Sequence, residues 1–294
     1  MTHRITLMTY LLSLVIIAAT GSSALAGGIF DDYESDTPET YPTGALRVMI
    51  VGADNNVVGV VDDGTISPGP YADPFGPAGN QSLVMEHISN NILANSGSVK
   101  VLYDTDNLDN TPGETGTVRF SADMYFQQTD PSVFEDAPMM ELRIGRRGNN
   151  ASHESAGTMA VRMRLSTFFG GAFIEIDEDE GSGNYVPIDN LVPLNTAFTL
   201  NLVMDTVAQT YTGDIDGTPL TDNAGAKSVF AFQANLSNID EITGVEYVAA
   251  YNKSPFSATF WVDNTRLTPE PTSLSLVGLG SLLLLGRRTQ RRRE

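Results

Sequence analysis

The chain contains no cysteine, only one tryptophan and only three histidines among its 294 residues. The absence of cysteine excludes disulfide bonds, thiol nucleophiles and zinc held by thiolates. His3 precedes an apolar segment, and His87 and His153 stand without neighbouring ligand residues, so we expect neither a Ser-His-Asp site nor a histidine metal site. Phosphate-binding loops and dinucleotide fingerprints are also absent. Binding, structural and carboxylate-based roles remain.

Basic residues are scarce as well, with 17 lysines and arginines against 36 aspartates and glutamates. Between residues 27 and 268 the imbalance is larger, 11 against 34, which gives a net charge of −23. A surface this acidic repels nucleic acids and anionic lipids, so we expect no nucleic-acid partner. Calcium, which prefers carboxylate oxygens, is the cation that such a surface favours.

The first 26 residues have the organisation of a secretory signal peptide. Arg4 supplies the positive end, Leu11 to Ala19 the apolar stretch, and Ala24-Leu25-Ala26 a small-x-small cleavage site. We therefore predict export by the Sec machinery, cleavage by signal peptidase, and a mature chain beginning at Gly27. A retained N-terminal anchor is the alternative.

The last 26 residues combine Pro269-Glu270-Pro271, an apolar run from Leu274 to Leu285, and a basic end. A helix over residues 272–286 would be about 22 Å long, shorter than the roughly 30 Å hydrocarbon core of a bilayer. Clustered arginines stay on the cytoplasmic side of a membrane. The tail is thus predicted to form a short C-terminal transmembrane helix with the rest of the chain outside. The basic residues are Arg287, Arg288, Arg291, Arg292 and Arg293.

This three-part layout resembles the PEP-CTERM sorting signal of Gram-negative bacteria, over residues 269–294 only. The resemblance implies that an exosortase, a membrane-embedded cysteine transpeptidase, recognises Pro269, Glu270 and Pro271 and processes the tail. It also implies a precursor tethered to the inner membrane that ends at the cell surface or in the extracellular matrix. An ordinary C-terminal membrane anchor is the alternative.

Residues 27–268 show the period-2 alternation of half-buried strands and no long helical period. In residues 118–126 the odd positions are polar or amphipathic and the even ones apolar, and residues 141–144, 161–165 and 197–205 alternate similarly. The pattern predicts an all-β, two-sheet antiparallel β-sandwich or jelly roll. Two hairpins are expected: one joins residues 46–51 to 57–61, and one turns at Asp216-Gly217.

The run Ala197 to Asp205, followed by Tyr211 and Asp214 to Thr218, resembles the centre of concanavalin A-like, laminin-G-like jelly rolls. Phe30 to Glu34 and Phe260 to Asn264 look like the first and last strands of that fold, which usually pair. The resemblance implies one jelly-roll domain over residues 27–268. The superfamily includes sugar-binding modules, glycoside hydrolases and adhesive domains, so the fold does not settle the function.

The segment Glu175-Ile-Asp-Glu-Asp-Glu180 fits the E-x-D-x-x-E pattern of laminarinase-like β-glucanases of this fold. That resemblance implies Glu175 as nucleophile, Asp177 as its helper and Glu180 as acid/base, in a retaining mechanism that requires carboxyls about 5–5.5 Å apart. Glu178 and Asp179, however, replace the apolar residues that the family packs there. A solvated hairpin tip is the alternative, and we do not expect an enzyme.

Two further sets of residues are candidate sites. For structural calcium they are the loop carboxylates Asp104, Asp106 and Asp109, and, by the jelly-roll resemblance, Glu34 with Asp263; hydrated turns are the alternative. For a ligand groove they are the wet-face residues Tyr125, Arg143, Arg162 and Arg164.

Trp261, the only tryptophan, is expected to fill the core. The leading hypothesis is an exported, non-catalytic module that binds glycan, such as extracellular polysaccharide, or a matrix partner. The alternatives are a retaining glycoside hydrolase and a structural component of an exopolysaccharide or biofilm matrix.

Overall fold

The computed structural model describes residues 29–31, 33, 47–51, 57–61, 73–76, 80–87, 98–104, 115–128, 137–146, 159–168, 171–177, 185–222, 224–233, 239–250 and 258–269. All of these except Pro269 belong to one unit, Gly28–Thr268. The predicted signal peptide and sorting tail belong to the other unit, Met1–Gly27 with Pro269–Glu294, and apart from Pro269 they lie outside the described residues. None of the described segments forms a helix long and apolar enough to span a bilayer.

Every helix or strand assigned in the described residues is a strand, and the strands form two antiparallel sheets. Sheet A contains β1 (Ile29–Asp31), β3 (Val57–Val61), β4 (Ser82–His87), β6 (Thr117–Gln128), β11 (Phe198–Asp205), β12 (Thr210–Ile215), β13 (Thr218–Pro219), β14 (Phe230–Ala231) and β16 (Ala258–Pro269). Sheet B contains β2 (Arg47–Val51), β5 (Ser98–Asp104), β7 (Ala137–Gly145), β8 (Met159–Phe168), β9 (Gly171–Asp177), β10 (Tyr185–Val192) and β15 (Gly244–Ala250). The predicted two-sheet antiparallel jelly-roll sandwich is confirmed.

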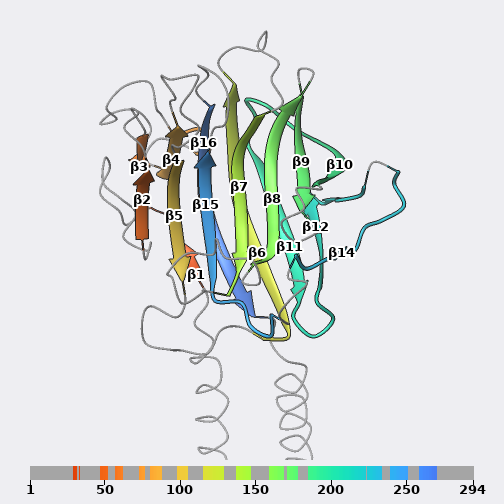
Figure 1. Ribbon diagram of the computed structural model, residues 1–294. Helices are drawn as coiled ribbons and strands as arrows, with labels where there is room; N and C mark the ends of the chain where they lie inside the picture. The colour runs from red at the N-terminus through yellow and green to blue at the C-terminus, as the bar shows by residue number, and fades with distance from the viewer. Residues whose placement is uncertain are drawn as a thin grey trace, which may run out of the picture. The chain divides into compact units, whose positions relative to one another are not determined.

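The strand order places neighbours together that are far apart in the sequence. Sheet A runs β13-β12-β11-β6-β16-β4-β3, with β1 paired to β16 and β14 to β12, and sheet B runs β10-β9-β8-β7-β15-β5-β2. Figure 1 shows strands of sheet B side by side in this order, with strands of sheet A behind them. Each face of a sheet therefore combines side chains from several strands that are far apart in the sequence.

Alternation along the strands builds the core between the sheets. The side chains of β11 alternate between buried and partly exposed along its whole length, as the sequence predicts. In the register of β11 with β6, Phe198 pairs with Met124 and Leu200 with Ala122, so apolar positions meet on one face. Each fully buried side chain of this size contributes about 1.5–3 kcal/mol to folding.

The last strand, β16, lies between β6 and β4 in sheet A. The predicted pairing of the first and last strands is present, since Ile29 pairs with Leu267 and Asp31 with Thr265. Along β16 the side chains that point into the core are those of residues 260 and 262 and then of residues 265 and 267. The step from 262 to 265 is one residue longer than the regular alternation of a strand, so the strand contains a bulge. Asn264 is the extra residue, with a φ of 51°, and this bulge places Asp263 and Asn264 together on the outward face of sheet A.

One predicted hairpin is confirmed and the other is wrong. Asp216 and Gly217 have φ values of 51° and 80°, and they connect β12 to β13 in a tight turn. In contrast, β2 pairs with β5 in sheet B while β3 pairs with β4 in sheet A. Polar turn residues between the two strands indicate a change of direction, but long-range burial decides which strand each one pairs with.

A network of buried hydroxyl groups connects the two sheets inside the core. Tyr103 donates a hydrogen bond to the hydroxyl of Tyr33 (2.9 Å), and the Thr265 hydroxyl bonds with those of Tyr247 (2.9 Å) and Tyr33 (3.3 Å). All four side chains are buried. Buried hydroxyls need such partners, because an unpaired one costs about 1–3 kcal/mol.

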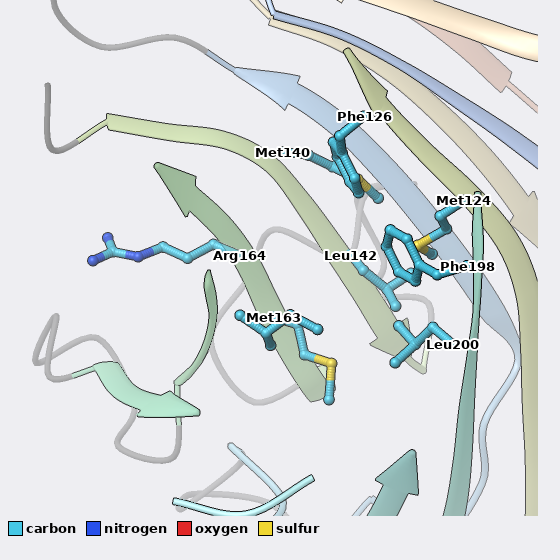
Figure 2. Close-up of a pocket in the computed structure, with 9 residues that line it drawn as sticks. Met124, Phe126, Met140, Leu142, Met163, Arg164, Phe198 and Leu200 are labelled. Atoms are coloured by element: carbon cyan, nitrogen blue, oxygen red, sulfur yellow. The ribbon is translucent and has the colours of Figure 1, made fainter. Parts of the chain in front are cut away.

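A small void remains in the core, with a volume of about 20 Å³. Figure 2 shows that Met163, Leu142 and Leu200 lie together at this void, whereas the Arg164 side chain extends away from them. An apolar space of this size holds no more than about one water molecule. It is a packing defect and not a ligand site. Its lining consists of Met124, Phe126, Met140, Leu142, Met163, Arg164, Ile174, Phe198 and Leu200.

Candidate functional site

The arginines that the sequence predicts for a ligand groove lie on the outward face of sheet B. Arg143 pairs with Arg162 of β8 on one side and with Glu246 of β15 on the other. Because Leu142 and Ile144 point into the core, Glu141 and Arg143 share the opposite face of β7. The predicted alternation is confirmed here, yet two side chains on this face are buried from solvent: Arg143 is 9% exposed and Glu246 1% exposed.

Four charged residues on this face of sheet B form a group that we call the charge quartet: Glu141, Arg143, Arg162 and Glu246. Arg143 donates to Glu141 from Nε (2.8 Å) and Nη2 (2.5 Å), and to Glu246 from Nη1 (3.1 Å). Arg162 donates to Glu141 Oε1 from Nη2 at 2.9 Å. Burial alone would raise the pKa of Glu141, but the guanidiniums of Arg143 and Arg162 hold that pKa below its usual value. With two charges of each sign, the quartet neutralises itself.

Tyr125, the fourth predicted groove residue, lies on β6 in sheet A and not with the arginines. Its ring makes an edge contact with Trp261 (centroids 5.4 Å apart), and the two belong to a small apolar cluster with Val84 and Phe75. Alternation separates inward from outward positions, but it does not say which sheet a strand joins. The prediction that Tyr125 lines one groove with the three arginines is therefore wrong, because they lie on different sheets. Trp261 is buried as expected, but in this outward cluster and not in the main core.

The bulge in β16 gathers carboxylates and amides on sheet A. Asn80 Nδ2 donates to Asp73 (3.0 Å) and Asp263 (3.3 Å), while Asn264 Nδ2 donates to Asp123 (2.9 Å) and Asp263 (3.2 Å). Two amides thus hold three carboxylates. Burial, together with the nearby charges of Asp73 and Asp123, raises the pKa of Asp263 to about 6 despite the hydrogen bonds from Asn80 and Asn264.

The described residues do not provide a complete set of ligands for either of the two predicted calcium sites. No three acidic or histidine side chains in this part of the chain are placed to share a metal ion. Asp104 ends β5, and Asp106, Asp109 and Glu34 lie outside the described residues. Both sites therefore stay predictions.

The predicted catalytic residues are only partly described. Glu175 and Asp177 occupy β9, at register positions opposite Arg164 and Tyr185 respectively, and β9 ends at Asp177. Glu180 lies outside the described residues. The carboxyl separation that a retaining glycosidase requires is therefore not tested, and the catalytic pair stays a prediction.

The outward face of sheet A carries a groove of about 400 Å³, which we call the sheet A groove. This volume lies within the range of about 300–1,000 Å³ typical of small-ligand sites. Four strands, β6, β11, β12 and β16, contribute to it. Its lining among the described residues is Arg119, Phe120, Ser121, Asn201, Leu202, Val203, Asp214, Arg266 and Thr268.

A row of hydrogen bonds crosses three strands in the sheet A groove. Ser121, Asn201 and Asp214 lie at one register position of β6, β11 and β12. Ser121 Oγ donates to Asn201 Oδ1 (2.9 Å), and Asn201 Nδ2 donates to Asp214 Oδ1 (2.9 Å). The backbone N–H of Gly217 in the adjoining turn donates to the same carboxylate oxygen (2.9 Å). These bonds fix the three polar side chains before any ligand arrives.

The sequence did not group the residues of the sheet A groove. Arg119, Ser121 and Asn201 stand at polar positions of strands that the alternation identifies correctly. The information that was missing is the order β12-β11-β6-β16, which brings them together with Asp214 and Arg266. An outward polar residue can be assigned to a site only when the strands on either side of it are known.

The comparisons with known proteins give distant structural matches. No family model and no curated protein matches the chain. Among solved structures, a sialidase shares 10% identity over 84% of this chain and 19% of its own length (TM-score 0.48), so the chain spans about a fifth of that protein. Lectin II from Ulex europaeus shares 10% identity over 82% of this chain and 97% of its own (0.44).

A marine alginate lyase from Zobellia galactanivorans shares 12% identity with the chain, over 70% of this chain and 85% of the lyase (TM-score 0.39). Similarities this distant do not indicate what this chain binds. The jelly-roll description rests on its own two sheets.

Proposed function

We propose that this protein is an exported, non-catalytic β-sandwich module that binds glycan of the cell envelope or extracellular matrix through the sheet A groove. The observation that carries the proposal is the hydrogen-bonded row Ser121-Asn201-Asp214 on the floor of a groove of about 400 Å³. Sugars are recognised chiefly through hydroxyl groups, which both donate and accept hydrogen bonds. An amide beside a carboxylate, with both held in place, offers both kinds of partner at little entropic cost.

Delivery to that location follows from the two ends of the sequence. The signal peptide, residues 1–26, would direct the chain across the membrane, and the tail, residues 269–294, would hold it there until an exosortase-type enzyme processes it. A net charge of −23 over residues 27–268 suits a soluble domain outside the cell. Under this proposal the charge quartet is structural, because its four charges are satisfied by one another.

Binding is tested by applying the full-length protein to an oligosaccharide array and measuring the affinity of each positive by calorimetry. Asn201→Ala removes the centre of the row, and Ser121→Ala removes its first donor. Ser228→Ala, at an exposed position that does not line the groove, is the matched control. We expect the first variant to weaken binding about tenfold and the control to leave it unchanged. Equal affinity in Asn201→Ala and the unmodified protein would contradict the proposal.

A further inference from the structure

We propose that the sheet A groove selects acidic glycans, whose carboxylate or sulfate group is held between Arg119 and Arg266; this inference rests on the proposed glycan-binding function. Over residues 27–268 acidic residues outnumber basic ones by 34 to 11. Among the described residues that line the groove the ratio is reversed, with two arginines and one carboxylate, Asp214. Two arginine side chains in one groove of a strongly negative domain favour a ligand that carries negative charge.

The two arginines come from neighbouring strands. Arg119 lies on β6 and Arg266 on β16, which are adjacent in sheet A, and both residues are exposed at the surface. A guanidinium presents a planar fork of N–H donors that fits carboxylate and sulfate oxygens in pairs. Two such forks on adjacent strands of one groove supply several N–H donors for an acidic group of the ligand.

The side of the groove at β12 requires a different chemical group. Asp214 Oδ1 accepts hydrogen bonds from Asn201 and from the Gly217 N–H, while its other oxygen accepts none from the described residues. That oxygen is available to a hydroxyl donor and would repel an anion. Strands in a sheet lie about 4.8 Å apart, so β6 and β12 are about 10 Å apart. The ligand must therefore be longer than an inorganic anion, with an acidic group at one end and hydroxyl groups at the other.

The experiment compares oligosaccharides that differ only in charge. Hexagalacturonate is titrated against its fully methyl-esterified form, and a sulfated oligosaccharide against its desulfated form, so that the two arms distinguish carboxylate from sulfate. Inorganic sulfate alone serves as the third probe. Measurements are made on the full-length protein at about 0.15 M salt, where a screening length of about 8 Å reduces the long-range repulsion of the acidic domain.

We expect at least one acidic form to bind about tenfold or more tightly than its neutral counterpart, and inorganic sulfate to bind weakly. Arg119→Gln and Arg266→Gln should each remove about tenfold of that preference. Arg119→Lys, which keeps the charge but loses the planar fork, should remove a smaller part. Arg146→Gln is the matched control, because Arg146 is partly exposed and pairs with Asp240 and Glu241, none of which lines the groove.

The outcomes separate this inference from the proposal on which it rests. If neutral forms bind as tightly as acidic ones and Asn201→Ala weakens the binding of both, glycan binding stands and acidic selectivity is overturned. The selectivity is overturned equally if Arg146→Gln reduces it as much as Arg119→Gln does, since the effect would then be one of net charge. If no oligosaccharide on the array or in either pair binds, both ideas are wrong.

Discussion

Arg143 donates two hydrogen bonds to a single oxygen of Glu141, two residues away on the same face of β7, and its remaining Nη1 reaches Glu246 on the adjacent strand at 3.1 Å. One guanidinium thus forms ion pairs with two buried carboxylates. Substituting Arg143→Met would leave Glu246 buried without its ion-pair partner, and we expect a loss of about 3 kcal/mol in the free energy of unfolding.

Denaturant titration measures this loss. The control is Arg146→Met, because Arg146 is half exposed and forms surface ion pairs with Asp240 and Glu241. Surface pairs contribute about 0–1 kcal/mol, so the control should change stability by no more than that. Equal effects of the two substitutions would contradict a structural role for the charge quartet.

Asp263 should make the protein less stable as the pH rises. Its pKa of about 6 in the folded state exceeds the usual 3.8, so the folded state retains a proton that the unfolded state has lost. The contribution of Asp263 to stability is complete below about pH 4 and declines up to about pH 6. Glu141, whose pKa is lowered, acts in the opposite direction at lower pH.

We expect Asp263→Asn to remove the decline between pH 4 and pH 6 when the melting temperature is measured against pH. Asp240→Asn, at an exposed position, serves as the matched control and should keep it. An unchanged pH profile in Asp263→Asn would show that this carboxyl does not titrate in that range.

The hydroxyl network in the core predicts a graded series of losses. Thr265 bonds with both Tyr33 and Tyr247, whereas the Tyr103 hydroxyl donates one hydrogen bond to the network, to Tyr33. Thr265→Val should therefore cost about 2 kcal/mol and Tyr103→Phe about 1 kcal/mol. Thr218→Val, on the exposed turn strand β13, should cost nothing measurable. Thermal unfolding of the three variants tests the order, and a larger loss for Tyr103→Phe would contradict it.

Two glycines in one hairpin should respond differently to alanine. At Gly217 the backbone has a φ of 80° and a Cβ would meet nothing within 4 Å, so Gly217→Ala should cost about 1 kcal/mol of conformational energy. At Gly213 a Cβ would lie 2.8 Å from the Asn201 carbonyl oxygen and 2.6 Å from Leu202. Gly213→Ala should cost more, about 2–3 kcal/mol, because backbone must move. Equilibrium unfolding of both variants gives the comparison.

The sorting hypothesis predicts two cuts in the exported protein. The secreted form should begin at Gly27 and should lack the arginines that follow Leu285, because signal peptidase and an exosortase-type enzyme would remove the ends. Replacing Glu270 by alanine should leave the tail attached. Intact mass measurement of the exported protein tests both, and recovery of the uncut chain from the cytosol would contradict export.

Much of the fold follows from local pattern. Alternation identifies β6, β7, β8 and β11, and Asp216-Gly217 identifies a turn, because both signals arise from neighbours in the sequence. The pairing of β2 and β3 was predicted wrongly, since two apolar runs flanking a turn are compatible with one sheet or with a crossing between two. That choice depends on strands elsewhere in the chain.

The site was less accessible from the sequence than the fold. Arg143 and Arg162 were correctly placed on an outward face, but only the register reveals that Glu141 and Glu246 neutralise them. The sheet A groove was missed because its polar residues lie on strands separated by up to 147 positions, from Arg119 to Arg266. Strand order is a property of the whole chain, and no local motif encodes it.

The position of β16 has a consequence for how the polypeptide is made. The strand that is synthesised last among those described lies between β6 and β4, and it also pairs with β1. Until residues 258–269 leave the ribosome, β6 and β4 lack the strand that lies between them in sheet A. Contacts between residues this distant in the sequence form slowly. An incompletely synthesised chain that ends before β16 would therefore keep sheet A in two separate parts, one on each side of the missing strand.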